Sequence, residues 1–298
     1  QDRPFKALNI KKLTFLNEPQ LMTKVCLVGA GGKMGMRLTH NLKDNADYQI
    51  SYLENGAAGI ENLKKFNITP AEEDVVIPEA DMVILGVPDL ILGKVSEQIV
   101  PKMKPGAVVI TLDPACALAG MLMHREDLTY FISHPSHPSV FNWEPTPEAR
   151  ADYFGGTLAK QTIVCAHYTG DETLYDACEK LATAMYAPVS KSFKITAGQM
   201  GLLEPALVET LCSTLQVIVK EGLDEVVKRG VPYEAAREFL LGHLNIQLAV
   251  IYQEIPGAVF SDAANKAIVR GKPLLINPDW KKVFEPDNVM EQIKDITS

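Results

Sequence analysis

The chain is poor in the features that mark a disulfide-stabilised, membrane-spanning or nucleic-acid-binding protein. Its 298 residues include five cysteines, and no two of them form a C-x-x-C pair. Cysteines scattered through apolar segments indicate reduced core residues of a cytoplasmic protein, not a disulfide or zinc framework. No apolar run reaches the roughly eighteen residues of a membrane span. The net charge of −8 and the pI of about 5.3 disfavour a general nucleic-acid or membrane-surface role.

Length and composition fit a protein of about two domains. The chain is 47% hydrophobic, which is enough for a sizeable core. Residues 1–21 lack the apolar core and the small-residue cleavage site of a secretory signal, so we expect an N-terminal extension without a role in the chemistry. Residues 22–194 carry alternating strand and helix patterns and form the predicted dinucleotide-binding domain. Residues 195–298 are predicted to form a helical substrate and dimerisation domain.

A glycine-rich turn between a strand and a helix organises the N-terminal part. Lys24–Val28 is typical of a buried strand, and Met34–Leu42 has the pattern of a helix. The turn between them has the spacing Gly-x-x-Gly-x-x-Gly with one additional glycine, a variant of the dinucleotide-binding pattern. Backbone N–H groups at such a helix start can bind a pyrophosphate, and a glycine turn without a ligand is the alternative. The predicted cofactor-binding residues of the turn are Gly29, Gly31, Gly32, Lys33, Met34 and Gly35.

The predicted identity of the cofactor depends on Glu54. This residue follows a second predicted strand, Tyr48–Leu53, about twenty positions after the glycines. A carboxylate there accepts hydrogen bonds from the adenosine ribose and repels the 2′-phosphate of NADP. No arginine follows Glu54 directly, so the sequence predicts NAD. A solvated loop charge is the alternative interpretation.

The pattern up to residue 194 alternates strands with helices. Further strands are expected at 81–87, 107–112, 130–133, 161–166 and 188–194. The alternation predicts an α/β fold, a doubly wound parallel sheet of Rossmann type with helices on both faces, followed by an all-helical domain. Ligands of such sheets lie at the carboxyl ends of the strands. We therefore expect Val87, Pro88 and Asp89 to line the cofactor groove, with Asp113–Ala115 as a further edge.

His134 follows the predicted strand at 130–133, so it leaves the sheet where the nicotinamide is expected. Its candidate roles are general base, proton donor and metal ligand, and a turn histidine bonded to the backbone is the alternative. His137 lies three residues later, and both histidines precede a proline, which favours extended backbone. Because extended residues alternate faces, we expect the two rings not to meet. Residues 140–156 are expected to form an irregular insertion over the site.

The C-terminal part is predicted to open with a long helix from Thr196 to Lys228, in which Pro205 marks a kink or a restart. Apolar residues occupy most of its circumference between Leu202 and Val227, and a helix of that kind is normally buried. A small helical domain cannot cover such a helix by itself. We therefore expect a homodimer.

Glu204 is the second candidate for chemistry. It lies among apolar residues near the start of this helix, where a buried carboxylate needs a partner; a first-turn carboxylate favoured by the helix dipole is the alternative. Glu209 is five residues later, roughly 140° around an α-helix, so we expect only one of the two to face the cleft. His134 and Glu204 are the predicted catalytic residues, and together they could bind one divalent metal ion, Zn or Mg.

Several motifs together resemble one group of oxidoreductases. The motifs are the glycine turn, Gly86-Val87-Pro88-Asp89, His134-Pro135-Ser136-His137-Pro138, Gly201 to Leu207, and Ser261-Asp262-Ala263. The resemblance is to the 6-phosphogluconate/β-hydroxyacid dehydrogenase superfamily, in the subgroup with a phosphogluconate-dehydrogenase-like C-terminal domain, and it covers residue 23 to about residue 284. It implies an NAD-dependent Rossmann domain, a helical dimerisation domain and a sugar-acid substrate.

One departure from that superfamily bears on the mechanism. The β-hydroxyacid dehydrogenases proper carry Lys-x-x-Asn on the long helix, whereas residues 196–204 contain no lysine. A lysine base is therefore not expected, which points again to His134 and Glu204. We expect NAD-dependent oxidation of a small polyhydroxy acid, with coupled isomerisation as one form of the reaction. The alternatives are a reductase of the prephenate or pyrroline-carboxylate type and a non-catalytic NAD sensor. Neither a nucleic acid nor a membrane is an expected partner.

Overall fold

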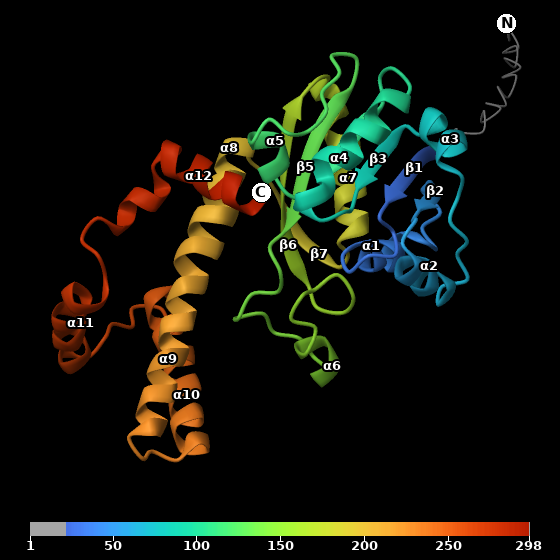
Figure 1. Cartoon of the computed structure of the whole chain (residues 1–298). Coiled ribbons are helices and arrows are strands. Elements are labelled where there is room, and N and C mark those ends of the chain that lie inside the picture. Colours follow the sequence, from blue (N-terminus) through green and yellow to red (C-terminus); the bar gives the residue numbers. More distant parts are fainter. Residues whose placement is uncertain (1–21, 298) are drawn as a thin grey trace, which may run out of the picture.

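The computed structural model describes residues 22–297, and the predicted extension, residues 1–21, lies outside the described residues. Figure 1 shows a sheet with helices on both faces and a helical arm that extends away from it. The last strand ends at Lys194, and the first helix of the arm begins at Ala197.

Seven strands form one sheet in the order β2-β1-β3-β4-β5-β6-β7. They are β1 (Thr23–Val28), β2 (Tyr48–Leu53), β3 (Met82–Leu85), β4 (Val108–Thr111), β5 (Thr129–Pro135), β6 (Gln161–Thr169) and β7 (Val189–Lys194). All neighbouring pairs are parallel except β5 and β6. The predicted parallel sheet is confirmed, with this one pair as the exception. Only the one-turn helix α6 (Pro147–Arg150) lies between them, and an antiparallel neighbour needs no crossover helix.

Helices cover both faces of the sheet, as predicted. Alternate residues of β1 point to opposite faces: Val25 and Leu27 belong to the core cluster that includes α1 and α7, and Cys26 and Val28 to the one that includes α4. The helices are α1 (Gly35–Leu42), α2 (Ala57–Lys64), α3 (Glu73–Val76), α4 (Asp89–Ile99), α5 (Ala115–Leu118) and α7 (Tyr175–Met185). Short 3₁₀ turns occur at Ile77–Glu79, Val100–Lys102, Glu172–Leu174 and Trp280–Phe284.

The predicted long helix is present and has three consecutive parts: α8 (Ala197–Gly201), a π-helical segment η4 (Leu202–Ser213) and α9 (Thr214–Lys228). Its start is capped as expected, because Thr196 Oγ1 accepts a hydrogen bond from Gln199 N at 3.1 Å. Pro205 lies inside η4, so the irregularity expected there is a widened helical turn and not a restart.

Three further helices complete the chain: α10 (Tyr233–Ile251), α11 (Asp262–Leu275) and α12 (Pro286–Thr297). Ser261 caps α11, because its Oγ accepts a hydrogen bond from Ala264 N. The last helix, α12, returns to the sheet domain and packs on α5, α4 and η4. The chain end therefore fixes the start of the long helix against the sheet.

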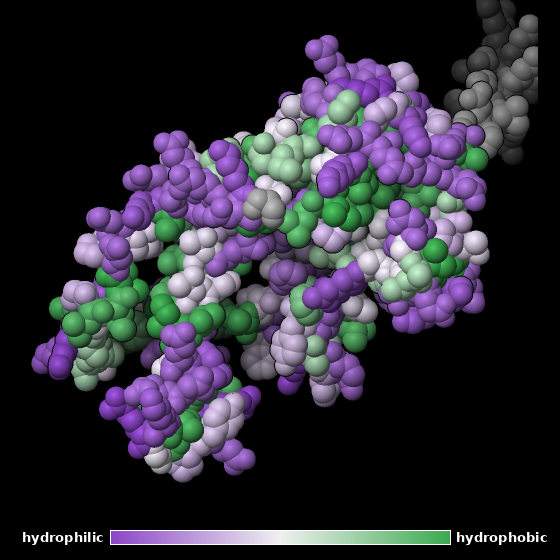
Figure 2. Space-filling view, in the orientation of Figure 1, coloured by the Kyte–Doolittle hydropathy of each residue, from purple (hydrophilic) through white to green (hydrophobic). Residues whose placement is uncertain are grey.

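The helical arm buries very little of itself within one chain. The only buried residues of the helices at its outer end are Leu223 of α9 and Ala236 of α10, and α11 has none. Figure 2 shows apolar surface on the arm, where a folded chain would normally hide it. Among the described residues, Ala197–Lys228 is a helix long and apolar enough to cross a membrane by length and composition, although the sequence has no uninterrupted apolar run of that length.

Candidate active site

The glycine turn packs backbone against backbone. Gly29 has a φ of +75°, and a Cβ on it would lie 2.7 Å from the carbonyl oxygen of Gly86. A Cβ on Gly31 would lie 2.1 Å from Gly59 O, and one on Gly35 would lie 2.0 Å from Gly29 O. Side chains at these positions are therefore excluded, which explains the spacing of the motif. Helix α1 begins at Gly35, so the turn meets a helix N-terminus as the sequence predicts.

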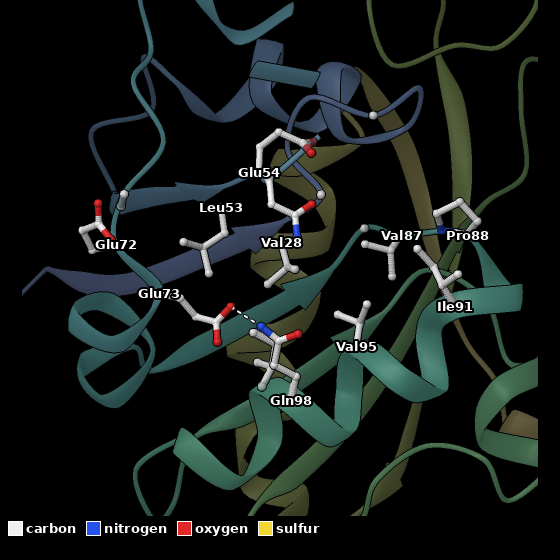
Figure 3. A pocket seen from close by; sticks show the side chains of 16 residues that line it. Val28, Leu53, Glu54, Glu72, Glu73, Val87, Pro88, Ile91, Val95 and Gln98 are labelled. Carbon is white, nitrogen blue, oxygen red and sulfur yellow. Dashed lines mark hydrogen bonds between the residues drawn. The ribbon is translucent and has the colours of Figure 1, made fainter. Parts of the chain in front are cut away.

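A groove of about 440 Å³ runs from this turn along the ends of β1, β2 and β3 (Figure 3). Its apolar wall consists of Val28, Leu53, Val87, Pro88, Ile91 and Val95. Glu54 lies in the groove, where its Oε2 accepts a hydrogen bond from Gly31 N at 3.0 Å and its Oε1 one from Gly56 N at 2.9 Å. The carboxylate therefore joins the end of β2 to the glycine turn. At another part of the wall, Gln98 donates to Glu73 at 2.7 Å.

A second cavity of about 420 Å³ adjoins the groove, and both are lined by Gly32, Gly86, Val87 and Pro88. Its remaining lining combines apolar side chains with charged and histidine side chains. The acidic and histidine side chains that line it are Asp89, Asp113, His134, His137, Glu204 and Glu209. We call Asp89, Asp113, His134, Glu204 and Glu209 the acidic cluster.

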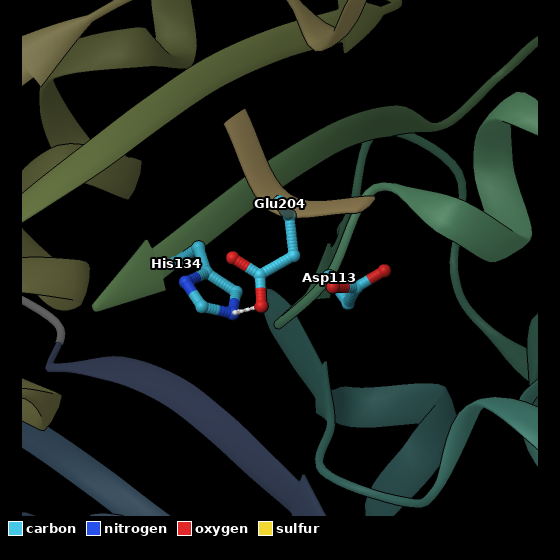
Figure 4. Close-up of side chains that lie close together, drawn as sticks. All are labelled: Asp113, His134 and Glu204. Atoms are coloured by element: carbon cyan, nitrogen blue, oxygen red, sulfur yellow. Dashed lines mark ion pairs between the residues drawn. The ribbon is translucent and has the colours of Figure 1, made fainter. Parts of the chain in front are cut away.

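His134 and Glu204, predicted to act together, do meet. His134 lies near the end of β5, and its Nε2 is 3.5 Å from Glu204 Oε1 (Figure 4). Both side chains are largely buried, with exposed fractions of 17% and 24%. The Nδ1 of His134 is 2.8 Å from the carbonyl oxygen of Pro135. Because that oxygen can only accept, Nδ1 carries a proton, and in the neutral ring Nε2 is left with its lone pair facing Glu204.

Asp113 completes a triad that the sequence did not assign. One ligand atom each from Asp113, His134 and Glu204 lie within 4.8 Å of one another. Asp113 comes two residues after β4, and its Oδ1 accepts a hydrogen bond from Ala115 N at 2.7 Å. Strands β4 and β5 are neighbours, so their carboxyl ends bring Asp113 to His134. The strand-end rule marked this edge, but no motif distinguished Asp113 from an ordinary turn aspartate.

The expectation that Glu204 and Glu209 face different directions was wrong. Both line the second cavity. Their separation was estimated for an α-helix, whereas this segment, η4, is π-helical. A π-helix hydrogen-bonds residue i to residue i+5, so two residues five apart lie one above the other on the same face.

Burial, and after it the charge of neighbouring carboxylates, raises the pKa of three carboxyl groups in the acidic cluster. Burial, and next to it the charge of Asp89, raises the pKa of Asp113 to about 7. Burial also raises the pKa of Asp89, against the opposing effect of His134. For Glu209, burial and the charge of Glu204 raise the pKa. Burial thus disfavours the ionised form of these carboxyl groups, and a bound cation would favour it.

The two histidine rings are close, contrary to the expectation. The ring centroids of His134 and His137 are 6.3 Å apart, and the ring of His137 lies 5.9 Å from that of Phe154. His137 has a φ of +60°, so the backbone turns there instead of remaining extended. Its Nδ1 is 2.8 Å from the carbonyl oxygen of Phe154. The insertion at 140–156 lies over the site as predicted, because Phe154 lines the second cavity.

Comparison with protein families and characterised proteins agrees with this geometry. Residues 142–297 match the family described as phosphogluconate dehydrogenase (decarboxylating) C-term. The chain is 51% identical over 275 residues to D-apionate oxidoisomerase of Cupriavidus necator, covering 92% of this chain and 99% of that protein. It is 47% identical over 277 residues to D-apionate oxidoisomerase of Rhizobium rhizogenes, covering 93% of this chain and 100% of that protein.

A solved structure gives the same result for the fold. The crystal structure of a semialdehyde dehydrogenase NAD-binding protein from Cupriavidus necator, in complex with calcium and NAD, superimposes with a TM-score of 0.90 at 50% identity. The match covers 93% of this chain and 100% of that one. Pyrroline-5-carboxylate reductase from Streptococcus pyogenes, at 13% identity and a TM-score of 0.57, shares the fold alone. The chain therefore belongs to the family of the D-apionate oxidoisomerases, oxidoreductases with a phosphogluconate dehydrogenase C-terminal region.

Proposed function

We propose that this protein is an NAD-dependent oxidoisomerase of a sugar acid, with D-apionate as the substrate, and that it oxidises a carbinol carbon and rearranges the resulting ketone. The observation that carries the proposal is the convergence of Asp113, His134 and Glu204 beside the groove that begins at the glycine turn. Polar groups from the sheet and from the long helix meet where a nicotinamide would project from that groove. The names of the relatives at 51% and 47% identity support the same reaction.

The groove fits NAD. Its apolar wall suits an adenine ring. The N–H groups of residues 29–32 already donate within the chain, so those of Lys33 and Met34, where the turn meets α1, would bind a pyrophosphate. Each oxygen of Glu54 accepts one backbone hydrogen bond, which leaves lone pairs for the ribose hydroxyls. A 2′-phosphate in that position would meet the charge of Glu54. The similar structure from Cupriavidus necator is an NAD complex, which supports this assignment.

The acidic cluster fits a divalent cation. Asp113 and Glu204 would supply carboxylate oxygens and His134 its Nε2, whose lone pair is free for this role because Nδ1 carries the proton. Burial, and next to it the charge of Asp89, raises the pKa of Asp113 to about 7, and a cation beside the carboxylate would oppose both effects. A bound cation would polarise the substrate oxygen and hold the ketone beside a neighbouring hydroxyl for the isomerisation.

Side chains of the protein would accept the proton that the substrate hydroxyl releases on oxidation. Oxidation of a carbinol releases a hydride to the nicotinamide and a proton from the hydroxyl group. Asp89 and Glu209 line the same cavity outside the triad, and each carboxyl group has a pKa above its ordinary value. A carboxyl whose pKa is raised takes up a proton near neutral pH more readily than an ordinary one. These two residues are thus the candidates for the proton acceptor.

A substrate assay tests the proposal. Purified protein with NAD and D-apionate should form NADH, and NMR of the product should show a rearranged carbon skeleton or carbonyl position. Chelator treatment should remove turnover, and added Mg²⁺ or Zn²⁺ should restore it. If the protein binds NAD but oxidises no member of a sugar-acid panel, the non-catalytic sensor is the better account. Reduction of an imine or keto acid by NADPH would instead favour the reductase.

We also infer that the protein is a cytoplasmic homodimer. The five cysteines are free, and four of them are buried, which suits a reducing compartment. Helix α11 buries none of its residues in one chain, and Phe239, Val269 and Leu275 of the arm are at least 70% exposed. A second copy would cover this apolar surface.

Light scattering at micromolar concentration tests the dimer. The measured mass should be at least twice the chain mass of 32.7 kDa. Phe239→Asp places a charge in the apolar surface and should shift the protein toward monomer or precipitation, whereas Glu221→Gln, at an exposed position of α9, should not. A stable, soluble monomer of the unmodified protein would refute the dimer.

A further inference from the structure

Arg37 is a half-buried cation that has no anion beside it. It lies in α1, one helical turn after Lys33, and both side chains line the cavity that contains the acidic cluster. Within residues 22–297, its guanidinium has neither a hydrogen bond nor an ion pair. The guanidinium stacks on the ring of Phe154, whose centroid is 4.1 Å from the guanidinium carbon.

Arg125 shows what a half-buried arginine normally does in this protein. Its guanidinium donates to the carboxylate of Asp127 and to the carbonyl oxygens of Val100 and Met103. A guanidinium group has five N–H donors, and such donors are rarely left unpaired away from water. The free donors of Arg37 therefore point to an anion that enters the cavity from outside the chain.

The acidic cluster is not that anion. Within residues 22–297, no carboxylate of the cluster forms an ion pair or a hydrogen bond with Lys33 or Arg37, and Glu204 is paired with His134. The cavity thus has two separate charged sides: an acidic one formed by the acidic cluster and a basic one formed by Lys33 and Arg37. The ring of His137 contacts both sides of the cavity: it lies 5.9 Å from the ring of Phe154, which packs on Arg37, and 6.3 Å from the ring of His134.

We propose that Arg37 binds the carboxylate of the sugar-acid substrate, while the hydroxyl groups reach the acidic cluster. This inference rests on the proposed function and specifies which end of the substrate lies where. The planar fork of a guanidinium matches a carboxylate through two parallel hydrogen bonds. Phe154 supports the group through its ring face, so the fork is held in place before the substrate arrives. Lys33, inside the glycine turn, is left for the cofactor pyrophosphate.

The test compares charged and uncharged substrates in matched variants. Kinetics of Arg37→Gln, Arg37→Lys and Lys33→Gln are measured with D-apionate and with its primary amide, alongside the equilibrium binding of NAD. Arg37→Gln should raise the KM for the acid by about 10- to 100-fold, the usual effect of losing a charge-assisted pair. It should raise the KM for the amide less than threefold and leave NAD binding unchanged. Arg37→Lys should be intermediate, because the bidentate contact is lost but the charge remains.

Lys33→Gln is the control variant, because Lys33 is assigned to the pyrophosphate of the cofactor and not to the carboxylate of the substrate. It should weaken NAD binding and leave the ratio of KM values for acid and amide unchanged. The inference is overturned if Arg37→Gln weakens NAD binding and leaves the KM for the acid unaltered. It is also overturned if the variant raises the KM for the acid and for the amide by the same factor. Should the unmodified protein oxidise no sugar acid, the proposed function fails and this inference fails with it. If the unmodified protein oxidises the sugar acid and Arg37→Gln does so with the same KM, the proposed function holds and only this inference is contradicted.

Discussion

The two cavities of this protein share a border but differ in how they are built. The cofactor groove comes from the sheet domain alone. Its lining includes the glycine turn after β1, the end of β2, the segment that follows β3, and α4. The acidic cluster takes Asp113 and His134 from two strand ends and Asp89 from the start of α4. Glu204 and Glu209 come from the long helix. Most lining side chains differ between the two cavities, although both include Gly32, Gly86, Val87 and Pro88. We therefore expect substitutions in the acidic cluster to change turnover and substitutions in the groove to change cofactor binding.

The largest expected effect is a loss of turnover in variants of the acidic cluster, while their affinity for NAD stays the same. His134→Ala and Glu204→Gln should each lower kcat by about 10²- to 10⁴-fold, since we propose that both groups act on the reacting atoms. NAD affinity should stay within twofold, because the groove is untouched. The double variant should be little worse than either single one, as is usual for residues that act as a unit.

Glu221→Gln is the matched control for this prediction. It makes the same substitution on the same long helix, at an exposed position, and should leave both kcat and NAD affinity unchanged. Near-full activity of either site variant would show that His134 and Glu204 are not the active centre. Attention would then move to His137, whose ring lies 6.3 Å from that of His134.

The second prediction concerns the groove alone. Glu54→Ser combined with Asn55→Arg should shift the preference between NAD and NADP toward NADP by about 10- to 100-fold, because a repelling carboxylate is replaced by a cation. The effect should lie in cofactor binding, with the acidic cluster unaffected. Competitive binding of the two cofactors measures it. Tighter binding of NADP than of NAD by the unmodified protein would contradict the role of Glu54.

The smallest predicted effect is on stability, and its sign follows from Asp113. In the folded chain its pKa is about 7, raised from 3.8. The folded state therefore holds a proton that the unfolded state has released, and stability falls as pH rises from about 4 to about 7. The melting temperature of metal-free protein should fall by a few degrees over this range. Asp113→Asn keeps an acceptor for Ala115 N and should flatten the dependence, as should a saturating divalent cation.

Local patterns made the groove predictable from sequence. The glycine spacing encodes close backbone contacts that exclude side chains, and Glu54 lies at a fixed distance along the chain. His134 was found by the same logic, since a strand end has a fixed place in an α/β sheet. The strand and helix alternation likewise predicted the sheet domain and the helical part after it.

The remainder of the site depends on features without a local signature. Glu209 joins Glu204 because the segment is π-helical, and neither Pro205 nor the apolar pattern specifies that form over an α-helix. Asp113 became a site residue only because β4 is the neighbour of β5. His137 approaches His134 through a positive φ that a residue before proline rarely adopts. Strand β6 runs antiparallel to β5 because no crossover helix joins them. The irregular pattern of residues 140–156 did not indicate whether such a helix was present.

Metal binding by the acidic cluster is the central claim, and equilibrium titration tests it without knowledge of the substrate. Chelator-treated protein is titrated with Mg²⁺, Mn²⁺ or Zn²⁺ by calorimetry, alongside Asp113→Asn, His134→Ala, Glu204→Gln and the Glu221→Gln control. The account predicts one divalent cation per chain, bound at least tenfold more weakly by each of the three triad variants and equally well by the control. Absence of binding, or the same affinity in all the variants, would contradict it.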